Sequence, residues 1–344
     1  MKSFDLKSLV RPNIWTLAPY SSARDEFSGS EGVFLDANEN PFGSLNRYPD
    51  PHQILLKTKL SDLKGAPREN IFIGNGSDEV IDLIYRVFTE PGKDSVIICP
   101  PTYGMYEVSA NINNVNIVKI PLLTDFQLDI DEILNKIEHD QSIKVIFVCS
   151  PNNPTGNIMK NINVLLENFS GIVVIDEAYI DFCPDKSFLN DIRKRPNLIV
   201  MQTFSKAWAL AGARVGIAYA QKDIISLFDK TKPPYNVSKL NQQAALDALA
   251  HYDDFKNRRT TILEQRMLLQ EELKNISCVK KVFPSVSNFL LVEVTDSDKI
   301  YNQLIKFKIV VRNRNSQIKN CLRITIGTPQ ENQMLLNALN NLSI

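Results

Sequence analysis

The sequence of 344 residues has few of the features that mark membrane, nucleic-acid-binding or exported proteins. No apolar run approaches the ~20 residues that span a bilayer, and the first thirteen residues lack the apolar stretch of a signal peptide. Lys and Arg together number 39, as do Asp and Glu, so the net charge is zero. A nucleic-acid-binding protein needs an excess of basic residues. We therefore expect neither a nucleic acid nor a membrane as a partner.

Cysteine and histidine are also scarce. The five cysteines are an odd number, widely spaced and without a CxxC pair, and the three histidines are scattered. This pattern indicates free thiols in a reducing compartment, so we expect a cytoplasmic protein. It also predicts that the chain has no metal site.

The length suggests about two domains. Residues 1–35 contain prolines at 12 and 19 and a Ser/Gly stretch at 28–32, which is typical of an irregular arm rather than a core element. We predict an arm at 1–35, a large α/β domain at 36–260 and a small α+β domain at 261–344.

Short apolar runs alternate with helical stretches from residue 71 onward. The runs are 95–99, 144–149, 171–175, 198–201 and 215–220. Continuous apolar runs of this length predict strands buried on both faces of a mostly parallel sheet sandwiched by helices. Helical spacing is clear at 80–88 and again at 240–275, with an interruption near 251–254. Farther on, we predict strands at 289–294 and 322–326 and helices at 298–307 and 331–342.

Ligands of open parallel sheets bind beyond the carboxyl ends of the strands, so the residues after each run are the candidates for a site. Lys206 follows one run within a nearly uncharged segment. It is either a surface lysine or a desolvated amine whose lowered pKa lets it form a Schiff base with an aldehyde. Asp176 ends another run, where it either caps a helix or faces a cationic ring nitrogen.

Gly76, Ser77 and Asp78 stand directly before the helix at 80–88. A helix N-terminus favours a bound phosphate, although such residues also cap helices without any ligand. The local sequence is not GxGxxG, so a dinucleotide site has little support. Arg214, Ser205 and Thr203 are candidates for further contacts to the same phosphate.

Aromatic and amide residues also follow the runs. Tyr103 and Tyr179 are either core aromatics or rings that stack on, or hydrogen-bond to, a flat cofactor, and Asn153 between prolines can be a simple turn. Arg312 and Arg323 can be surface charges. However, Arg323 lies within an apolar run, where a guanidinium needs an anion such as a carboxylate.

Four segments together resemble the fold-type I pyridoxal phosphate (PLP)-dependent aminotransferases. They are SPNNPTG at 150–156, DEAY at 176–179, TFSKAWALAGARVG at 203–216 and CLRITIG at 321–327. The chain is more narrowly similar to the histidinol-phosphate aminotransferases in APYSSAR at 18–24, DANENPFG at 36–43, RYPDP at 47–51 and KPPYNVS at 232–238. The similarity covers nearly the whole chain in the same order.

The resemblance implies a role for each candidate. Lys206, Asp176 and Tyr179 are the implied catalytic residues: Lys206 joins the cofactor aldehyde and moves a proton, Asp176 pairs with the ring nitrogen, and Tyr179 contacts the ring hydroxyl with Asn153. Tyr103 is implied to stack on the ring. The residues implied to surround the cofactor phosphate are Gly76, Ser77, Asp78 through its backbone N–H, Thr203, Ser205 and Arg214.

The resemblance also implies a homodimer in which Tyr48 reaches the phosphate of the partner's cofactor. Arg323 is implied to hold the α-carboxylate of glutamate or 2-oxoglutarate. Arg312, helped by Tyr20, is implied to bind the phosphate of histidinol phosphate, while Asn38 and Glu39 line the substrate pocket. Three alternatives stay open: a threonine-phosphate decarboxylase, a broad aromatic aminotransferase, or a nucleotide-binding or regulatory α/β protein without this chemistry.

Overall fold

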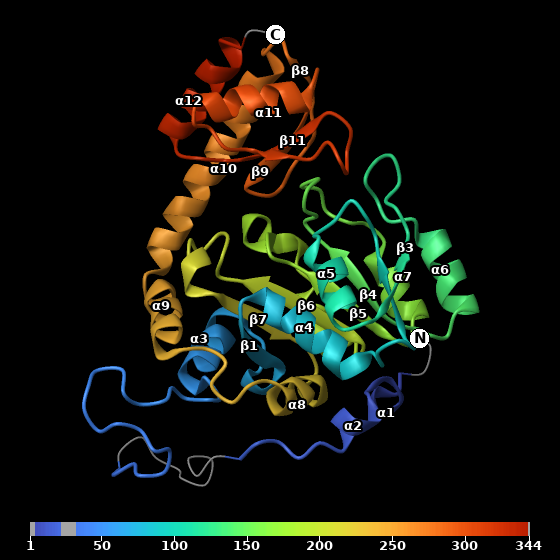
Figure 1. The fold of residues 1–344 in the computed structure, drawn as a ribbon, viewed down its shortest axis with the longest axis vertical. Helices are drawn as coiled ribbons and strands as arrows, with labels where there is room; N and C mark the ends of the chain where they lie inside the picture. Colours follow the sequence, from blue (N-terminus) through green and yellow to red (C-terminus); the bar gives the residue numbers. More distant parts are fainter. Residues whose placement is uncertain (1–3, 22–31, 343–344) are drawn as a thin grey trace.

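The computed structural model describes residues 4–21 and 32–342, which form two sheets with helices around them (Figure 1). The large sheet has the strand order β1-β7-β6-β5-β4-β2-β3. Its strands are β1 (Ile71–Asn75), β2 (Ser95–Ile98), β3 (Asn116–Lys119), β4 (Ile143–Cys149), β5 (Ile172–Asp176), β6 (Leu198–Thr203) and β7 (Val215–Tyr219).

Most strand pairs of the large sheet are parallel. From β3 through β2, β4 and β5 to β6 every pairing is parallel, whereas β7 runs antiparallel to both β6 and β1. The carboxyl ends of the other six strands therefore meet at one edge, and β7 begins at that same edge. The prediction of a mostly parallel sheet is confirmed.

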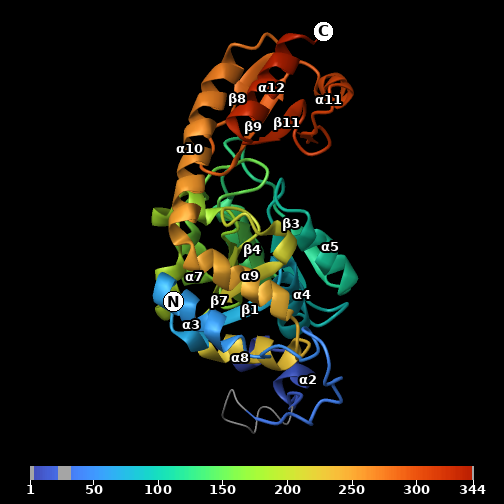
Figure 2. The ribbon, with the colours of Figure 1, turned by 90° about the vertical axis from the view of Figure 1, so that its left-hand side faces the viewer.

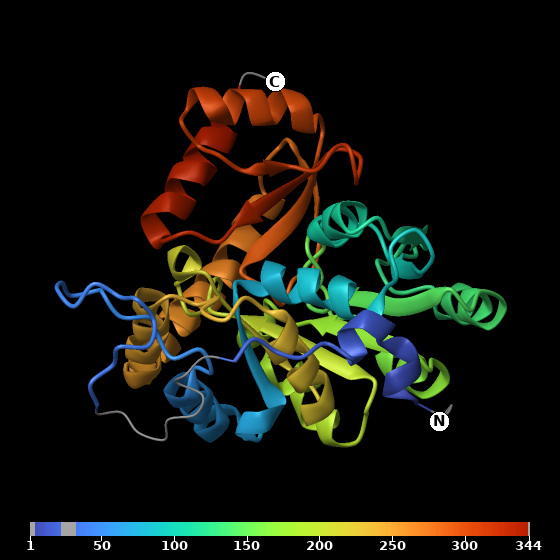
Figure 3. The same ribbon diagram turned by 60° about the horizontal axis from the view of Figure 1, so that its bottom comes forward.

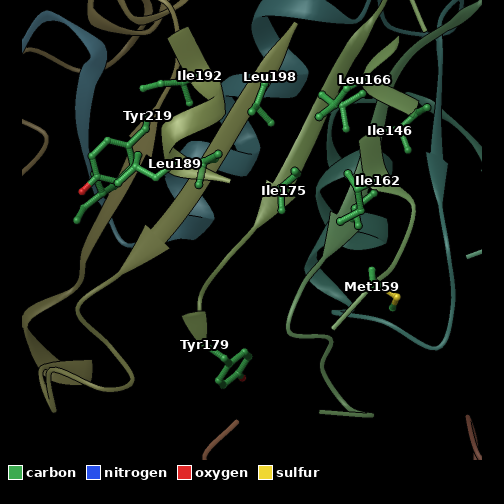
Figure 4. Close-up of a cluster of buried hydrophobic side chains, with 14 of the residues drawn as sticks. Ile146, Met159, Ile162, Leu166, Ile175, Tyr179, Leu189, Ile192, Leu198 and Tyr219 are labelled. Carbon is green, nitrogen blue, oxygen red and sulfur yellow. The ribbon is translucent and has the colours of Figure 1, made fainter. Parts of the chain in front are cut away.

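Helices cover both faces of this sheet. Alternate residues of a strand point to opposite faces, so Val173 and Ile175 of β5 belong to one apolar cluster and Ile172 and Val174 to another. Figure 4 shows part of the first cluster. The first face is covered by α3 (Ile54–Lys64), α6 (Ile130–His139), α7 (Ile162–Asn168) and α9 (Lys239–Ala250), and the second by α4 (Ser77–Phe88), α5 (Met105–Ile112) and α8 (Lys222–Thr231). The predicted sandwich is confirmed.

The N-terminal segment differs from our expectation that it contributes nothing to the core. Residues 4–21 form two short helices, α1 (Leu6–Leu9) and α2 (Pro12–Trp15). Val10 and Ile14 are buried in the second apolar cluster, and the Arg11 N–H donates to the Val87 carbonyl at 2.9 Å. Helices of four residues are too short to show a period in the sequence. Residues 22–31 lie outside the described residues.

The C-terminal part has its own sheet, with the order β10-β11-β9-β8 and antiparallel pairing throughout. Its elements are α10 (Tyr252–Lys274), β8 (Val279–Val282), β9 (Phe289–Val294), α11 (Ser297–Lys306), β10 (Arg312–Asn313), β11 (Cys321–Thr325) and α12 (Pro329–Asn340). A separate apolar cluster joins this sheet to its three helices. The predicted small α+β unit is therefore present, and Figure 3 shows it above the layers of the large sheet.

The helix α10 runs from the large sheet to the small one (Figures 1 and 2). The helical stretch predicted for 240–275 is divided at His251 into α9 and α10, close to the predicted interruption. Residue 260, the predicted domain limit, falls inside α10, so the limits at 35 and 260 stay predictions. None of the described helices is both long and apolar enough to cross a bilayer.

Candidate active site

A cavity of about 530 Å³ opens at the carboxyl edge of the large sheet, and the small sheet contributes part of its wall. Figure 4 shows Tyr179 beyond the end of the strand that carries Ile175. Twelve of the predicted site residues line this cavity: Ser77, Asp78, Tyr103, Asn153, Asp176, Tyr179, Thr203, Ser205, Lys206, Arg214, Arg312 and Arg323. The sequence thus predicts the principal site, although its residues come from most of the length of the chain.

Asp176 ends β5 and is buried at the floor of the cavity. Its Oδ2 accepts a hydrogen bond from the Tyr106 hydroxyl at 2.6 Å, and its Oδ1 accepts one from the Ala178 N–H at 3.0 Å. Burial raises the pKa of Asp176, while these two hydrogen bonds oppose the rise. No described lysine or arginine forms an ion pair with this carboxylate. A cationic group in the cavity would therefore stabilise its ionised form.

Lys206 follows β6 and faces the same cavity. Desolvation by the surrounding chain lowers the pKa of Lys206, and the guanidinium of Arg323 lowers it further, against the opposing effect of Asp176. The residue nevertheless remains exposed toward the open space of the cavity, so a ligand can reach its amine. Its Nζ lies 5.5 Å from the centre of the Tyr179 ring.

A small cradle forms where β1 ends and α4 begins. Gly76 has a φ of +79°, and a Cβ there would lie 2.5 Å from Nη2 of Arg214. Gly76 provides no side-chain cap, so the first N–H groups of α4 point to the cradle. The carboxylate of Asp78 accepts hydrogen bonds from the Tyr103 hydroxyl at 3.0 Å and from Arg214 at 3.1 Å. The role predicted for the backbone N–H of Asp78 stays a prediction.

Two hydroxyl side chains line the same cavity. Thr203 and Ser205 both line the cavity, and their hydroxyl oxygens are 3.0 Å apart. The backbone N–H of Ser205 donates to the Thr203 hydroxyl oxygen at 3.1 Å. Together with Arg214, these groups offer hydrogen-bond donors to a phosphate.

Tyr179 and Asn153, which follow strands of the large sheet, line the same cavity as Asp176. The Tyr179 ring packs edge-to-face on Phe289 at a centroid distance of 5.1 Å, and burial raises the pKa of the Tyr179 phenol. The amide oxygen of Asn153 accepts hydrogen bonds from the guanidinium groups of Arg314, at 3.4 Å, and Arg323. The amide nitrogen of Asn153 donates to none of the described residues, so it is available to a ligand.

Four of the predicted site residues do not line this cavity. Asn38, Glu39 and Tyr48 line a second cavity of about 450 Å³, where Tyr48 stacks on Tyr235 at a centroid distance of 4.3 Å. Glu39 pairs with Arg47 at 2.7 Å. Tyr20 borders a third and much smaller cavity. Their roles in the principal site stay predictions.

Sequence reasoning missed Arg314, which lines the principal cavity, and the buried Tyr106, which does not line it but donates a hydrogen bond to Asp176. The other lining residues that it missed are Gly104, Met105, Val108, Cys149 and Ala178. Tyr106 is three residues after Tyr103, a spacing that places both on one side of a helical turn, and this was the available signal. Arg314 lies directly after the two-residue strand β10, so no strand pattern in the sequence marks it. Burial and the neighbouring guanidiniums of Arg323 and Arg312 lower the pKa of Arg314 to about 10.

The fold and this cavity define a class of protein that comparison with known sequences also identifies. Residues 27–339 match the family described as aminotransferase class I and II, and the chain belongs to this family. It is 53% identical to the histidinol-phosphate aminotransferase of Parabacteroides distasonis over 345 residues, and this alignment covers 99% of each chain.

Two solved structures are similar across most of the chain. The histidinol-phosphate aminotransferase of Clostridium acetobutylicum has a TM-score of 0.78 and 26% identity, over 86% of this chain and 90% of that one. The enzyme of the same name from Sinorhizobium meliloti, solved in complex with pyridoxal-5'-phosphate, has the same TM-score and identity, over 86% and 82%.

Proposed function

We propose that the cavity binds pyridoxal phosphate. Two observations support the fit. The missing Cβ of Gly76 leaves room for Arg214 and a phosphate at the N-terminus of α4, and the buried carboxylate of Asp176 faces a cavity without a protein cation paired to it. When bound, this cofactor supplies an aldehyde that captures amines and a ring that takes up electrons from the substrate's α carbon.

Different residues around the cavity then contact different parts of the cofactor. Ser77, Ser205 and Arg214 bind its phosphate, with the Asp78 N–H and the hydroxyl of Thr203 adding donors. Asp176 holds a proton on the ring nitrogen. Tyr103 packs against the ring, while Tyr179 and the amide nitrogen of Asn153 donate to its hydroxyl oxygen.

Lys206 is the base of the reaction. Its Nζ takes the proton from the substrate's α carbon, a step that requires the neutral amine. The lowered pKa of Lys206 increases the neutral fraction at neutral pH. Its Nζ lies over the ring of Tyr179, a second residue of the proposed site.

The chain is a transaminase of histidine biosynthesis. We assign it glutamate and 2-oxoglutarate as one substrate pair, and histidinol phosphate and imidazole-acetol phosphate as the other. The observation that carries this assignment is the meeting of Lys206 and Asp176 with Arg312 and Arg323 in one cavity, in a chain 53% identical to a histidinol-phosphate aminotransferase. Arg323 binds the α-carboxylate of glutamate, and Arg312 binds the substrate phosphate.

We also propose that the enzyme works as a homodimer. Tyr48 would reach the partner's cofactor phosphate, and Tyr20, Asn38 and Glu39 would complete the partner's substrate pocket. This accounts for the distance of these four residues from the principal cavity of their own chain. The five cysteines are free, which fits a cytoplasmic enzyme.

The test is a pair of measurements on the purified holoenzyme. Borohydride reduction followed by peptide mass analysis should place the cofactor's mass on the peptide that contains Lys206. With 2-oxoglutarate as acceptor, histidinol phosphate should be converted to its oxo product faster than phenylalanine or phosphothreonine. Lys206→Ala, the control, should lower turnover by at least about 10³-fold, as expected for loss of a general base.

Other results would contradict the proposal. CO2 release from phosphothreonine would favour the decarboxylase, and a preference for phenylalanine would favour the aromatic aminotransferase. Failure of borohydride to attach the cofactor to the chain would remove the role of Lys206.

A further inference from the structure

Three guanidinium groups of the C-terminal part line the principal cavity. Arg312 and Arg323 are register partners in the antiparallel pair of β10 and β11, so their side chains stand on the same face. Arg314 follows Arg312 by two residues, and all three side chains line the cavity of about 530 Å³. Like charges directly opposite each other destabilise a strand pair, so this face is suited to an anion.

The protein itself does not balance these charges. Among residues 4–21 and 32–342, no carboxylate forms an ion pair with Arg312, Arg314 or Arg323. Arg314 donates to two neutral oxygens, those of Asn153 at 3.4 Å and Gln317 at 3.3 Å. The Nε atoms of Arg314 and Arg323 are buried without a hydrogen-bond partner. A buried polar group without a partner is costly, and an anionic ligand in the cavity would offset the charge of these guanidiniums.

The roles proposed above leave one of these arginines unassigned, because Arg323 takes the α-carboxylate and Arg312 the phosphate. We infer that Arg314 is a second ligand of the substrate phosphate and that, with Arg312, it makes the enzyme select a phosphate ester over the distal carboxylate of glutamate. This inference rests on the proposed function.

Charge and geometry favour this division. A phosphate monoester carries about −1.5 to −2 charges at neutral pH and three acceptor oxygens, whereas the distal carboxylate of glutamate carries a single charge and two oxygens. Two guanidiniums match the former in charge and in number of donors. When glutamate is bound, the second guanidinium has less negative charge to neutralise. Its removal should therefore raise the Kd of glutamate less than the Kd of histidinol phosphate.

An alternative role for Arg314 is to orient Asn153, whose amide oxygen it shares with Arg323. Asn153 faces the cofactor and not one particular substrate. Loss of an orienting residue would therefore weaken the reactions of histidinol phosphate and glutamate equally. The ratio between the two substrates separates the two roles.

The experiment uses Arg314→Gln in the holoenzyme, with single-turnover kinetics that separate the apparent Kd from the limiting rate for each amino donor. We expect the Kd of histidinol phosphate to rise at least about tenfold, as for the loss of one hydrogen bond between charged groups. The Kd of glutamate should change by less than about threefold. Gln317→Ala, which removes only a neutral partner of Arg314, is the matched control and should leave both values within about twofold.

Equal losses for both donors, or no loss for either, would overturn the inference. If Arg314→Gln fails to fold by thermal melting, Arg314→Lys carries the test, because it keeps the charge but not the fork of donors, and it should shift the same ratio in the same direction. Inorganic phosphate, used as a competitor of glutamate at saturating cofactor, should inhibit Arg314→Gln more weakly than the parent enzyme. The inhibition measurement tests phosphate binding even if histidinol phosphate is not converted. The inference and the proposed function can therefore be contradicted independently of each other.

Discussion

The carboxylate of Asp176 is held in one orientation by a donor on each oxygen, Tyr106 on one and the Ala178 N–H on the other. The Tyr106 ring is itself fixed, because it stacks on Phe147 at a centroid distance of 4.9 Å and meets the edge of Tyr103 at 5.6 Å. Tyr106 therefore connects the carboxylate beneath the cofactor site to the ring proposed to lie against the cofactor.

Tyr106→Phe removes the hydroxyl and keeps the aromatic packing. The hydrogen bond stabilises the ionised carboxylate, so its loss should raise the pKa of Asp176 further. A carboxylate that is protonated more readily would be less able to keep the proposed cofactor's ring nitrogen in its protonated form. We expect kcat to fall roughly tenfold, the effect of one hydrogen bond to a charged group. The pH titration of the holoenzyme's absorbance should shift as well.

Tyr85→Phe is the matched control for this variant. Tyr85 is also a buried tyrosine, but its hydroxyl donates to the Tyr106 carbonyl at 2.7 Å and not to Asp176. Its loss should lower stability while leaving the absorbance titration unchanged. A titration in Tyr106→Phe that matches the parent enzyme would show that Tyr106 does not act on the carboxylate.

Among the secondary-structure elements, most strands buried on both faces were predictable from sequence, whereas β1, which is also buried, was not among the predicted runs. The five predicted runs correspond to β2, β4, β5, β6 and β7, where continuous burial requires continuous apolar sequence. The edge strand β3 was not predicted because its end residues are exposed. The strand β10 has two residues, too few for a pattern, and for this reason Arg314 was missed although Arg312 was found.

At the start of α4, Gly76→Ala tests the proposed phosphate cradle. The new Cβ would collide with Nη2 of Arg214, so this side chain must move away from the cradle. We expect the Kd of pyridoxal phosphate to rise at least about tenfold from the loss of a charge-assisted contact, measured by fluorescence titration of the apoenzyme.

Gly65→Ala is the control for backbone strain. Gly65 ends α3 with a φ of +72°, close to that of Gly76, but a Cβ there has nothing within 4 Å. Both variants should lose about 1 kcal/mol or more of unfolding free energy, because alanine is disfavoured at positive φ. Equal cofactor affinity in the two variants would contradict the cradle.

On the scale of the whole molecule, the principal site needs both sheets. The large sheet supplies the residues proposed to hold the cofactor, and the small sheet supplies three arginines, with α10 connecting the two parts. The ordered motifs made this convergence predictable from the sequence. The position of Tyr20, Asn38, Glu39 and Tyr48 outside the cavity was not predictable from local pattern, because these residues lie outside the helices and strands whose periods show in the sequence.

The segment before α3 carries an exposed apolar surface. Val33, Leu35 and Phe42 are each more than 80% exposed, at 88%, 87% and 82%, and they flank the residues proposed to act in the partner's site. Apolar side chains gathered on one exposed segment are typical of a protein interface. The homodimer would bury them and bring Tyr48 to a second cofactor site.

Mixing two inactive variants tests this shared site. In a hybrid of Lys206→Ala with Tyr48→Ala, one site combines the intact Lys206 of one subunit with the intact Tyr48 of the other. Random reassembly makes half of the dimers hybrids with one intact site each, so the mixture should recover about a quarter of the parent activity above that of the separate variants.

The control mixture pairs Lys206→Ala with Asp176→Ala, two changes that we place in the site of the same subunit. Every hybrid of these variants has one defect in each site, so no activity should return. Recovery in the first mixture but not in the second requires Tyr48 to act across the interface. If neither mixture recovers activity while hybrid dimers are detected by native mass spectrometry, Tyr48 does not complete its partner's site, and the four residues outside the cavity would need another explanation.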